Sequence, residues 1–154
     1  MSWIQALVAS ADVERRATLE KILGECGLDT VLASNTEEVR IILLQEPIHL
    51  VFCEDNLPEG DFRAILRLAK ATRPDAHVVV SSLLGEWDAY LEAMQLGAFD
   101  FIAPPYRGPE ILSIVNSVCP DYLVKQTQGE DPLPHSGRSV VSGRQGNRLR
   151  RYAS

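Results

Sequence analysis

The sequence predicts an α/β domain in which five short parallel strands alternate with five helices. Five short apolar runs recur along residues 1–119, and each has the length and composition of a strand that is buried on both faces. Each run is followed by a segment in which apolar residues recur at helical spacing, and several of these segments begin at a good N-cap residue. A chain of 154 residues with 45% apolar residues can fill one core of this kind.

The first two strand–helix units occupy the first third of the chain. A strand is predicted at Ala6–Ala9, and the helix after it begins at Asp12, an N-cap residue, and ends before Gly27, which suits a left-handed C-cap. The second strand is predicted at Thr30–Ala33. Asn35 then caps a second helix, because an acidic residue follows it three positions later and apolar residues follow at helical spacing.

Three further units repeat the pattern. Their strands and helices are predicted at Ile48–Cys53 and Phe62–Ala71, at His77–Ser81 and Glu86–Leu96, and at Phe99–Ala103 and Pro109–Val118. Strands joined by single helices need right-handed crossovers, which place helices on both faces of a parallel sheet. The predicted fold is therefore a flavodoxin-like, doubly wound (βα)5 domain with strand order 2-1-3-4-5. Its functional crevice is expected at the carboxyl ends of the strands.

The composition changes after Cys119. Residues 1–119 carry 9 Lys+Arg and 18 Asp+Glu, a net charge of −9, whereas residues 120–154 carry 6 and 3, a net charge of +3. The second segment is rich in Pro, Gly, Ser and Arg, and it holds too few apolar residues to offset the entropy lost on ordering. We expect a folded domain over 1–119 and a basic, disordered tail over 120–154.

Several functional classes are disfavoured by the sequence. No stretch approaches the ~20 apolar residues of a membrane span, and the first residues lack the pattern of a secretory signal, so we expect a cytoplasmic protein without membrane contact. Cys26, Cys53 and Cys119 lack the spacing of a metal site. No glycine-rich phosphate loop follows the first strand, and no Ser or Cys nucleophile is tied to His77. We therefore expect neither an enzyme nor a cofactor.

Two segments near the crevice carry a resemblance to a known family. The run Leu50–Pro58, LVFCEDNLP, is similar to a strand, an acidic acceptor residue and the turn after it. The run Leu96–Tyr106, LGAFDFIAPPY, is similar to a Gly-Ala…Lys-Pro-Phe ending. With these motifs, residues 4–119 resemble the receiver domain of bacterial two-component response regulators.

The resemblance implies a phosphorylation site at the crevice. In that family an acidic pair after the first strand holds magnesium, and an aspartate at the end of the third strand is phosphorylated. A Ser or Thr after the fourth strand and a lysine after the fifth contact the phosphoryl group. At these positions the present chain has Ser10 and Ala11, Glu54, Ser82 and Pro104. Three of the four functions have therefore changed.

The changes all disfavour phosphoryl chemistry. Ser10 and Ala11 cannot supply the anionic oxygens that magnesium prefers. Glu54 carries its carboxylate one methylene farther out, away from the in-line position, and the proline at the lysine position has no charge. We therefore expect a degenerate receiver, or pseudo-receiver, without phosphorylation or metal. The alternative is an atypical acceptor at Glu54 or Asp55, and a weaker alternative makes Asp12 a metal ligand instead of a helix cap.

Two residues, Glu54 and Phe101, decide whether the domain can still switch between two conformations, and each has two interpretations. Glu54 is either a solvated, leftover carboxylate or a permanent charge that mimics a phosphoryl group. The leftover is favoured because Pro104 removes the cation that such a charge would use. Phe101 matches the family's aromatic switch position, with Ser82 as the matching hydroxyl, but a core role is favoured for Phe101.

The resemblance also implies how such a module acts. We expect protein–protein contact with a histidine kinase or a downstream effector, through a face that includes Trp87, Tyr90 and Tyr106. A homodimer through the fourth helix, the last strand and the last helix is a further possibility. Nucleic acid is expected only as a partner of the arginine-rich tail, because the domain is acidic.

Overall fold

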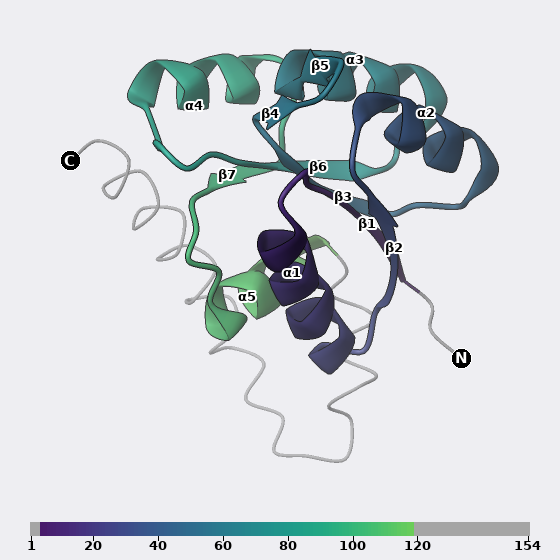
Figure 1. Cartoon of the computed structure of the whole chain (residues 1–154), viewed down its shortest axis with the longest axis vertical. Coiled ribbons are helices and arrows are strands. Elements are labelled where there is room, and N and C mark those ends of the chain that lie inside the picture. The colour runs from purple at the N-terminus through teal and green to yellow at the C-terminus, as the bar shows by residue number, and fades with distance from the viewer. Residues whose placement is uncertain (1–3, 119–154) are drawn as a thin grey trace.

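A computed structural model describes residues 4–118 (Figure 1). Cys119 and the segment 120–154, which we predicted to be a basic and disordered tail, lie outside these residues. Within residues 4–118, no helix combines the length and the apolar character that a membrane crossing needs.

The centre of the domain is one parallel sheet. Its strands are β1 Gln5–Ala9, β2 Asp29–Ala33, β3 Leu50–Glu54, β6 His77–Ser81 and β7 Asp100–Ile102. They pair in the order β2-β1-β3-β6-β7, and every pairing among them is parallel. Counted by chain order within this sheet, the arrangement is 2-1-3-4-5, so the predicted flavodoxin-like topology is confirmed.

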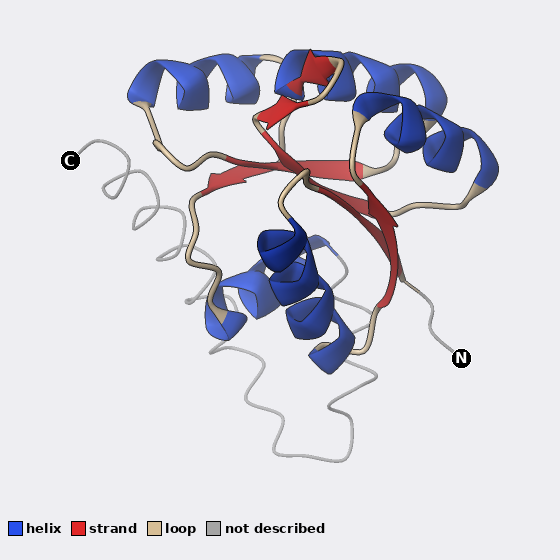
Figure 2. Ribbon diagram, viewed as in Figure 1, coloured by secondary structure: helices blue, strands red, loops and turns tan. Residues whose placement is uncertain are grey.

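The five helices of residues 4–118 cover the two faces of the sheet (Figure 2). On one face lie α1 Val13–Glu25 and α5 Gly108–Val118. On the other lie α2 Thr36–Gln45, α3 Phe62–Thr72 and α4 Trp87–Gln95. All five helices match predicted ones, and the predicted caps Asp12 and Asn35 each accept a backbone N–H of the first turn.

Alternate residues of the central strands fill two cores. From β1 and β3, Val8 and Leu50 point to the α1–α5 side, whereas Leu7 and Val51 point to the side of the other three helices. All four side chains are fully buried. This burial on both faces explains why the strands appear in the sequence as continuous apolar runs instead of alternating ones.

A small hairpin between β3 and α3 was not predicted. It pairs β4 Asn56–Leu57 with β5 Gly60–Asp61 in antiparallel fashion. Glu59 turns the chain with a φ of 70°, and Leu57 is buried. At Gly60 a Cβ atom would lie 2.7 Å from Thr36 Oγ1, so the hairpin packs against the start of α2 only because residue 60 has no side chain. The strand before it begins at Leu50, two residues later than predicted.

Candidate functional site

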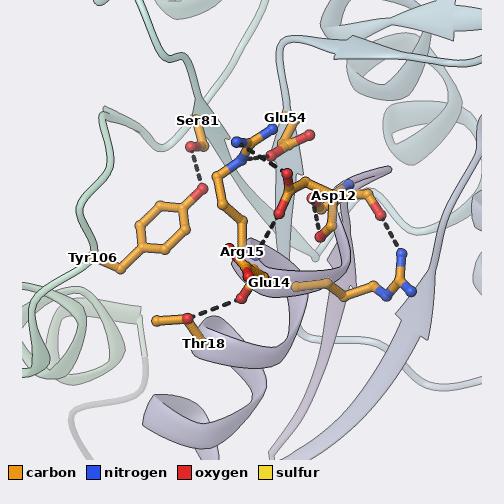
Figure 3. A network of polar contacts seen from close by, with 9 residues as sticks. Asp12, Glu14, Arg15, Thr18, Glu54, Ser81 and Tyr106 are labelled. Atoms are coloured by element: carbon orange, nitrogen blue, oxygen red, sulfur yellow. Dashed lines mark hydrogen bonds and ion pairs between the residues drawn. The ribbon is translucent and has the colours of Figure 1, made fainter.

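The carboxyl ends of three neighbouring strands bring polar residues together at one edge of the sheet (Figure 3). Ser10 follows β1, Glu54 ends β3, and Ser81 ends β6, where it is paired in register with Glu54. All three residues are buried, with exposures of 1%, 8% and 3%. These buried residues lie at the edge of the sheet where the functional crevice is predicted.

The Glu54 carboxylate forms an ion pair with Arg15, from the first turn of α1. The Arg15 Nε donates a hydrogen bond to Glu54 Oε2 (Figure 3). The same guanidinium lies 3.4 Å from Asp12 Oδ2. The side chains of Arg15 and Glu54 are 28% and 11% exposed. Chiefly through its hydrogen bond, Glu54 raises the pKa of Arg15.

This geometry changes one of the two interpretations of Glu54. The carboxylate is not freely solvated, because its side chain is only 11% exposed and one of its oxygens is paired with a cation. Sequence reasoning missed Arg15, since the two residues are 39 positions apart. The contact between Arg15 and Asp12 could have been predicted from the sequence, because an arginine three residues after a capping aspartate lies beside it on the helix. The contact between Arg15 and Glu54 could not, because it depends on how α1 packs on the sheet.

Asp12 is held in place by the chain around it. Its Oδ1 accepts the backbone N–H of Arg15 at 2.8 Å, and this bond is the largest cause of a lowered Asp12 pKa. Its own backbone N–H donates to Ser10 Oγ at 3.1 Å. Asp12 therefore caps α1, as expected.

The residues at this edge do not fit a divalent cation. Magnesium prefers several anionic or carbonyl oxygens with room for water. Here Glu54 and Asp12 both face a guanidinium, and Ser10 is bonded to backbone. Among residues 4–118, no group of three or more His, Cys, Asp or Glu side chains is arranged to hold a metal ion. Ala11, the second position of the degenerate pair, is exposed and offers no side-chain oxygen.

Tyr106 points toward the crevice and not toward an exposed surface. It is 9% exposed, and its hydroxyl shares a hydrogen bond with Ser81 Oγ at 2.6 Å (Figure 3). Burial is the main cause of its raised pKa. Our prediction that Tyr106 belongs to a face open to partners is therefore wrong. The Tyr106 ring lies beside the end of β6, where its hydroxyl and the buried Ser81 hydroxyl satisfy each other.

The remaining site positions lie beside this centre. Ser82 is 2% exposed, and its Oγ accepts the Gly85 N–H at 3.3 Å. Phe101 is fully buried and belongs to the core on the α4 side of the sheet, which supports the core interpretation. Pro104 and Asp55 are half-buried. The proline offers no cation, and the cation beside the Glu54 carboxylate is Arg15 of α1.

The two aromatic residues of α4 contact each other. Trp87 is 40% exposed and stacks on Tyr90, with ring centroids 5.2 Å apart. Tyr90 in turn meets Phe101 edge to face, with a centroid distance of 5.8 Å. The partner face stays a prediction, and of its two α4 residues Trp87 is the more exposed.

Known proteins similar in sequence to this chain include a response regulator and a transcriptional regulator. No family model matches the sequence. Over 105 residues, or 68% of the chain, it is 32% identical to the response regulator protein PilR of Pseudomonas aeruginosa. Over 119 residues, or 77% of the chain, it is 27% identical to the DNA-binding transcriptional regulator NtrC of Salmonella typhimurium. The chain spans about a quarter of each relative, 24% and 25%.

Solved structures similar to this one are receiver domains and response regulators. The beryllofluoride-activated NtrC4 receiver domain dimer matches with a TM-score of 0.71 and 22% identity, over 77% of this chain and 98% of that one. A response regulator from Thermotoga maritima matches with a TM-score of 0.69 and 24% identity, again over 77% and 98%. The fold of residues 4–118 is therefore that of a receiver domain.

Proposed function

Because the described residues have the fold of a receiver domain and are similar in sequence to response regulators, we propose that this chain is a receiver-type signalling module that acts by protein–protein contact without being phosphorylated. The observation that carries the proposal is the ion pair between Arg15 and Glu54. It engages the carboxylate at the acceptor position and places a guanidinium beside it.

Electrostatics make phosphoryl transfer to this carboxylate unfavourable. Transfer concentrates negative charge on oxygens next to the nucleophile, and a divalent cation and an ammonium normally offset that charge. Here the one guanidinium of Arg15 is already shared between Glu54 and Asp12. To attack a phosphorus atom, Glu54 would have to give up its hydrogen bond in a buried environment, which costs more than in water.

The ion pair also changes the balance between the two interpretations of Glu54. The leftover interpretation depended on the missing cation at Pro104. Arg15 supplies a cation from α1, and burial strengthens the interaction. We therefore favour a fixed charge pair that keeps the domain in one signalling state at all times. In this view the pair takes the place of a switch that phosphorylation would operate.

Whether acetyl phosphate can phosphorylate this chain needs a direct test. The chain is incubated with acetyl phosphate and magnesium chloride, and its intact mass is measured beside a receiver domain that has an aspartate acceptor. We expect phosphorylation of the reference domain and no phosphoryl adduct on this chain. The matched variants Glu54→Gln and Asp55→Asn locate any adduct that forms. An adduct that disappears in either variant would identify an atypical acceptor and contradict the proposal.

The partners are proposed from the relatives and from the exposed part of α4. A histidine kinase or a downstream effector is the class of protein that such a module contacts, with Trp87 as the most exposed aromatic residue of the face. A homodimer through α4, β7 and α5 is the alternative, and sedimentation of the chain at several concentrations distinguishes the two.

A further inference from the structure

An apolar and acidic patch is exposed where β6 leads into α4. We call it the α4 patch, and its members are Leu83, Leu84, Glu86, Trp87, Asp88 and Leu91. The four apolar members are 64%, 77%, 40% and 40% exposed in chain order, and the two carboxylates are exposed as well. Exposed apolar side chains that adjoin one another in this way are typical of an interaction surface.

The charges of the α4 patch are not balanced within the domain. Neither Glu86 nor Asp88 is in an ion pair with any other of residues 4–118. Trp87 stacks on Tyr90 and is 40% exposed, and an exposed indole is a side chain that attracts cations. Carboxylates, an exposed indole and leucines together suit a segment that combines arginines with apolar side chains.

We propose that the α4 patch binds the chain's own residues 138–154. This segment carries five arginines and no acidic residue, at 138, 144, 148, 150 and 151. It also has apolar side chains beside the arginines, Val140, Val141, Leu149 and Tyr152. A second copy of the domain is a poorer occupant, because it would bring another Glu86 and Asp88 against the first pair.

The connection is long enough for this contact. The last helix ends at Val118, so residues 119–137 connect it to the arginine-rich segment. Nineteen residues can span up to roughly 60 Å, whereas a domain of this size has a radius of gyration of about 13 Å. A tethered segment also acts at an effective concentration near the millimolar range, so a weak contact is sufficient.

Such a contact covers the same face that we propose for signalling partners. The arginine-rich segment would compete with these partners for the α4 patch. Partner binding would then require that the segment first dissociate from the patch. The inference does not depend on whether Glu54 is phosphorylated, so its test and the acetyl phosphate test can fail separately.

The first experiment compares the chain with a variant in which the five arginines are replaced by glutamine. Amide NMR spectra of both are recorded at low and high protein concentration. We expect the signals of residues 83–91 to differ between the two chains and to be independent of concentration. Unchanged signals at 83–91 would overturn the proposal, and so would shifts that grow with concentration, because these would indicate a second copy. If the chain retards DNA in a gel, the five-glutamine variant does not, and the α4 signals of the two are the same, then the segment binds nucleic acid and the proposal is wrong.

The second experiment tests the acidic half of the contact. A synthetic peptide of residues 138–154 is titrated onto the five-glutamine chain and onto two further versions of it. Glu86→Gln with Asp88→Asn removes two charges from the α4 patch and should weaken binding about tenfold. Glu20→Gln with Glu25→Gln removes two exposed charges from α1, on the opposite face of the sheet, and should change binding by less than about twofold. Equal losses in the two versions would show that only the net charge matters and would overturn the assignment to α4.

Discussion

Two arginines in this domain make the same pattern of ion pairs in different surroundings. Arg15 and Arg63 each lie in the first turn of a helix and contact the aspartate that caps it, Asp12 or Asp61. Each also reaches a glutamate far along the chain, Glu54 or Glu92. The side chains of the first pair are 28% and 11% exposed, and those of the second are 40% and 41% exposed.

From this difference in burial, and not from the pairing itself, we expect the two ion pairs to contribute differently to stability. Removing one partner of a buried pair leaves an uncompensated charge in a poorly solvated place, whereas water and salt take over at the surface. The crevice pair should therefore affect stability and the state of the domain. The surface pair joins α3 to α4 but should contribute little.

The largest expected effect comes from Arg15→Gln. The change leaves the buried Glu54 without its cation, so we expect the free energy of unfolding to fall by about 1–3 kcal/mol, less than for a fully buried pair because Arg15 is partly exposed. Urea denaturation measures it, with Arg63→Gln as the matched control. Equal losses in the two variants would break the comparison.

A double variant separates the pair from the individual residues. If Arg15 and Glu54 act on each other, Arg15→Gln with Glu54→Gln should lose less stability than the two single changes added together, by about 0.5–3 kcal/mol. Strict additivity would mean that the geometry of the pair contributes nothing.

A smaller effect is expected from Tyr106→Phe. The change removes one partner of the hydrogen bond to Ser81 and leaves a buried hydroxyl unsatisfied, which costs about 1–2 kcal/mol. In the double variant Tyr106→Phe with Ser81→Ala, the loss from the unsatisfied hydroxyl should be reduced. Thermal unfolding by circular dichroism measures both. No loss in the single variant would indicate that water reaches this part of the crevice.

The smallest effect concerns pH at the surface pair. The hydrogen bond from Arg63 is the main cause of a lowered Glu92 pKa. A carboxyl whose pKa is lower in the folded state stabilises the fold above its unfolded pKa, and this contribution is lost as the pH falls through the folded value. Any difference in melting temperature between the chain and Arg63→Gln should therefore be present at neutral pH and disappear in acid. A difference that grows in acid would contradict the assignment.

The fold was predictable because its signals are local. Buried strands such as β3 appear as unbroken apolar runs, and caps such as Asp12 and Asn35 act on residues in their own first turn. The sequence predicted where the candidate site lies on the sheet, but it did not predict which side chains contact one another there. The pairing of Arg15 with Glu54 and the inward turn of Tyr106 depend on how α1 and the segment after β7 pack on the sheet, and no local pattern encodes that packing.

The close approach at Gly60 has a consequence for how this chain can diverge over generations. Because a Cβ at position 60 would collide with the Thr36 hydroxyl, the hairpin and the start of α2 restrict each other's substitutions. Any side chain at position 60 is expected to be inherited with a smaller residue at position 36. Among descendants of this gene the two positions should therefore covary, although neither belongs to the crevice.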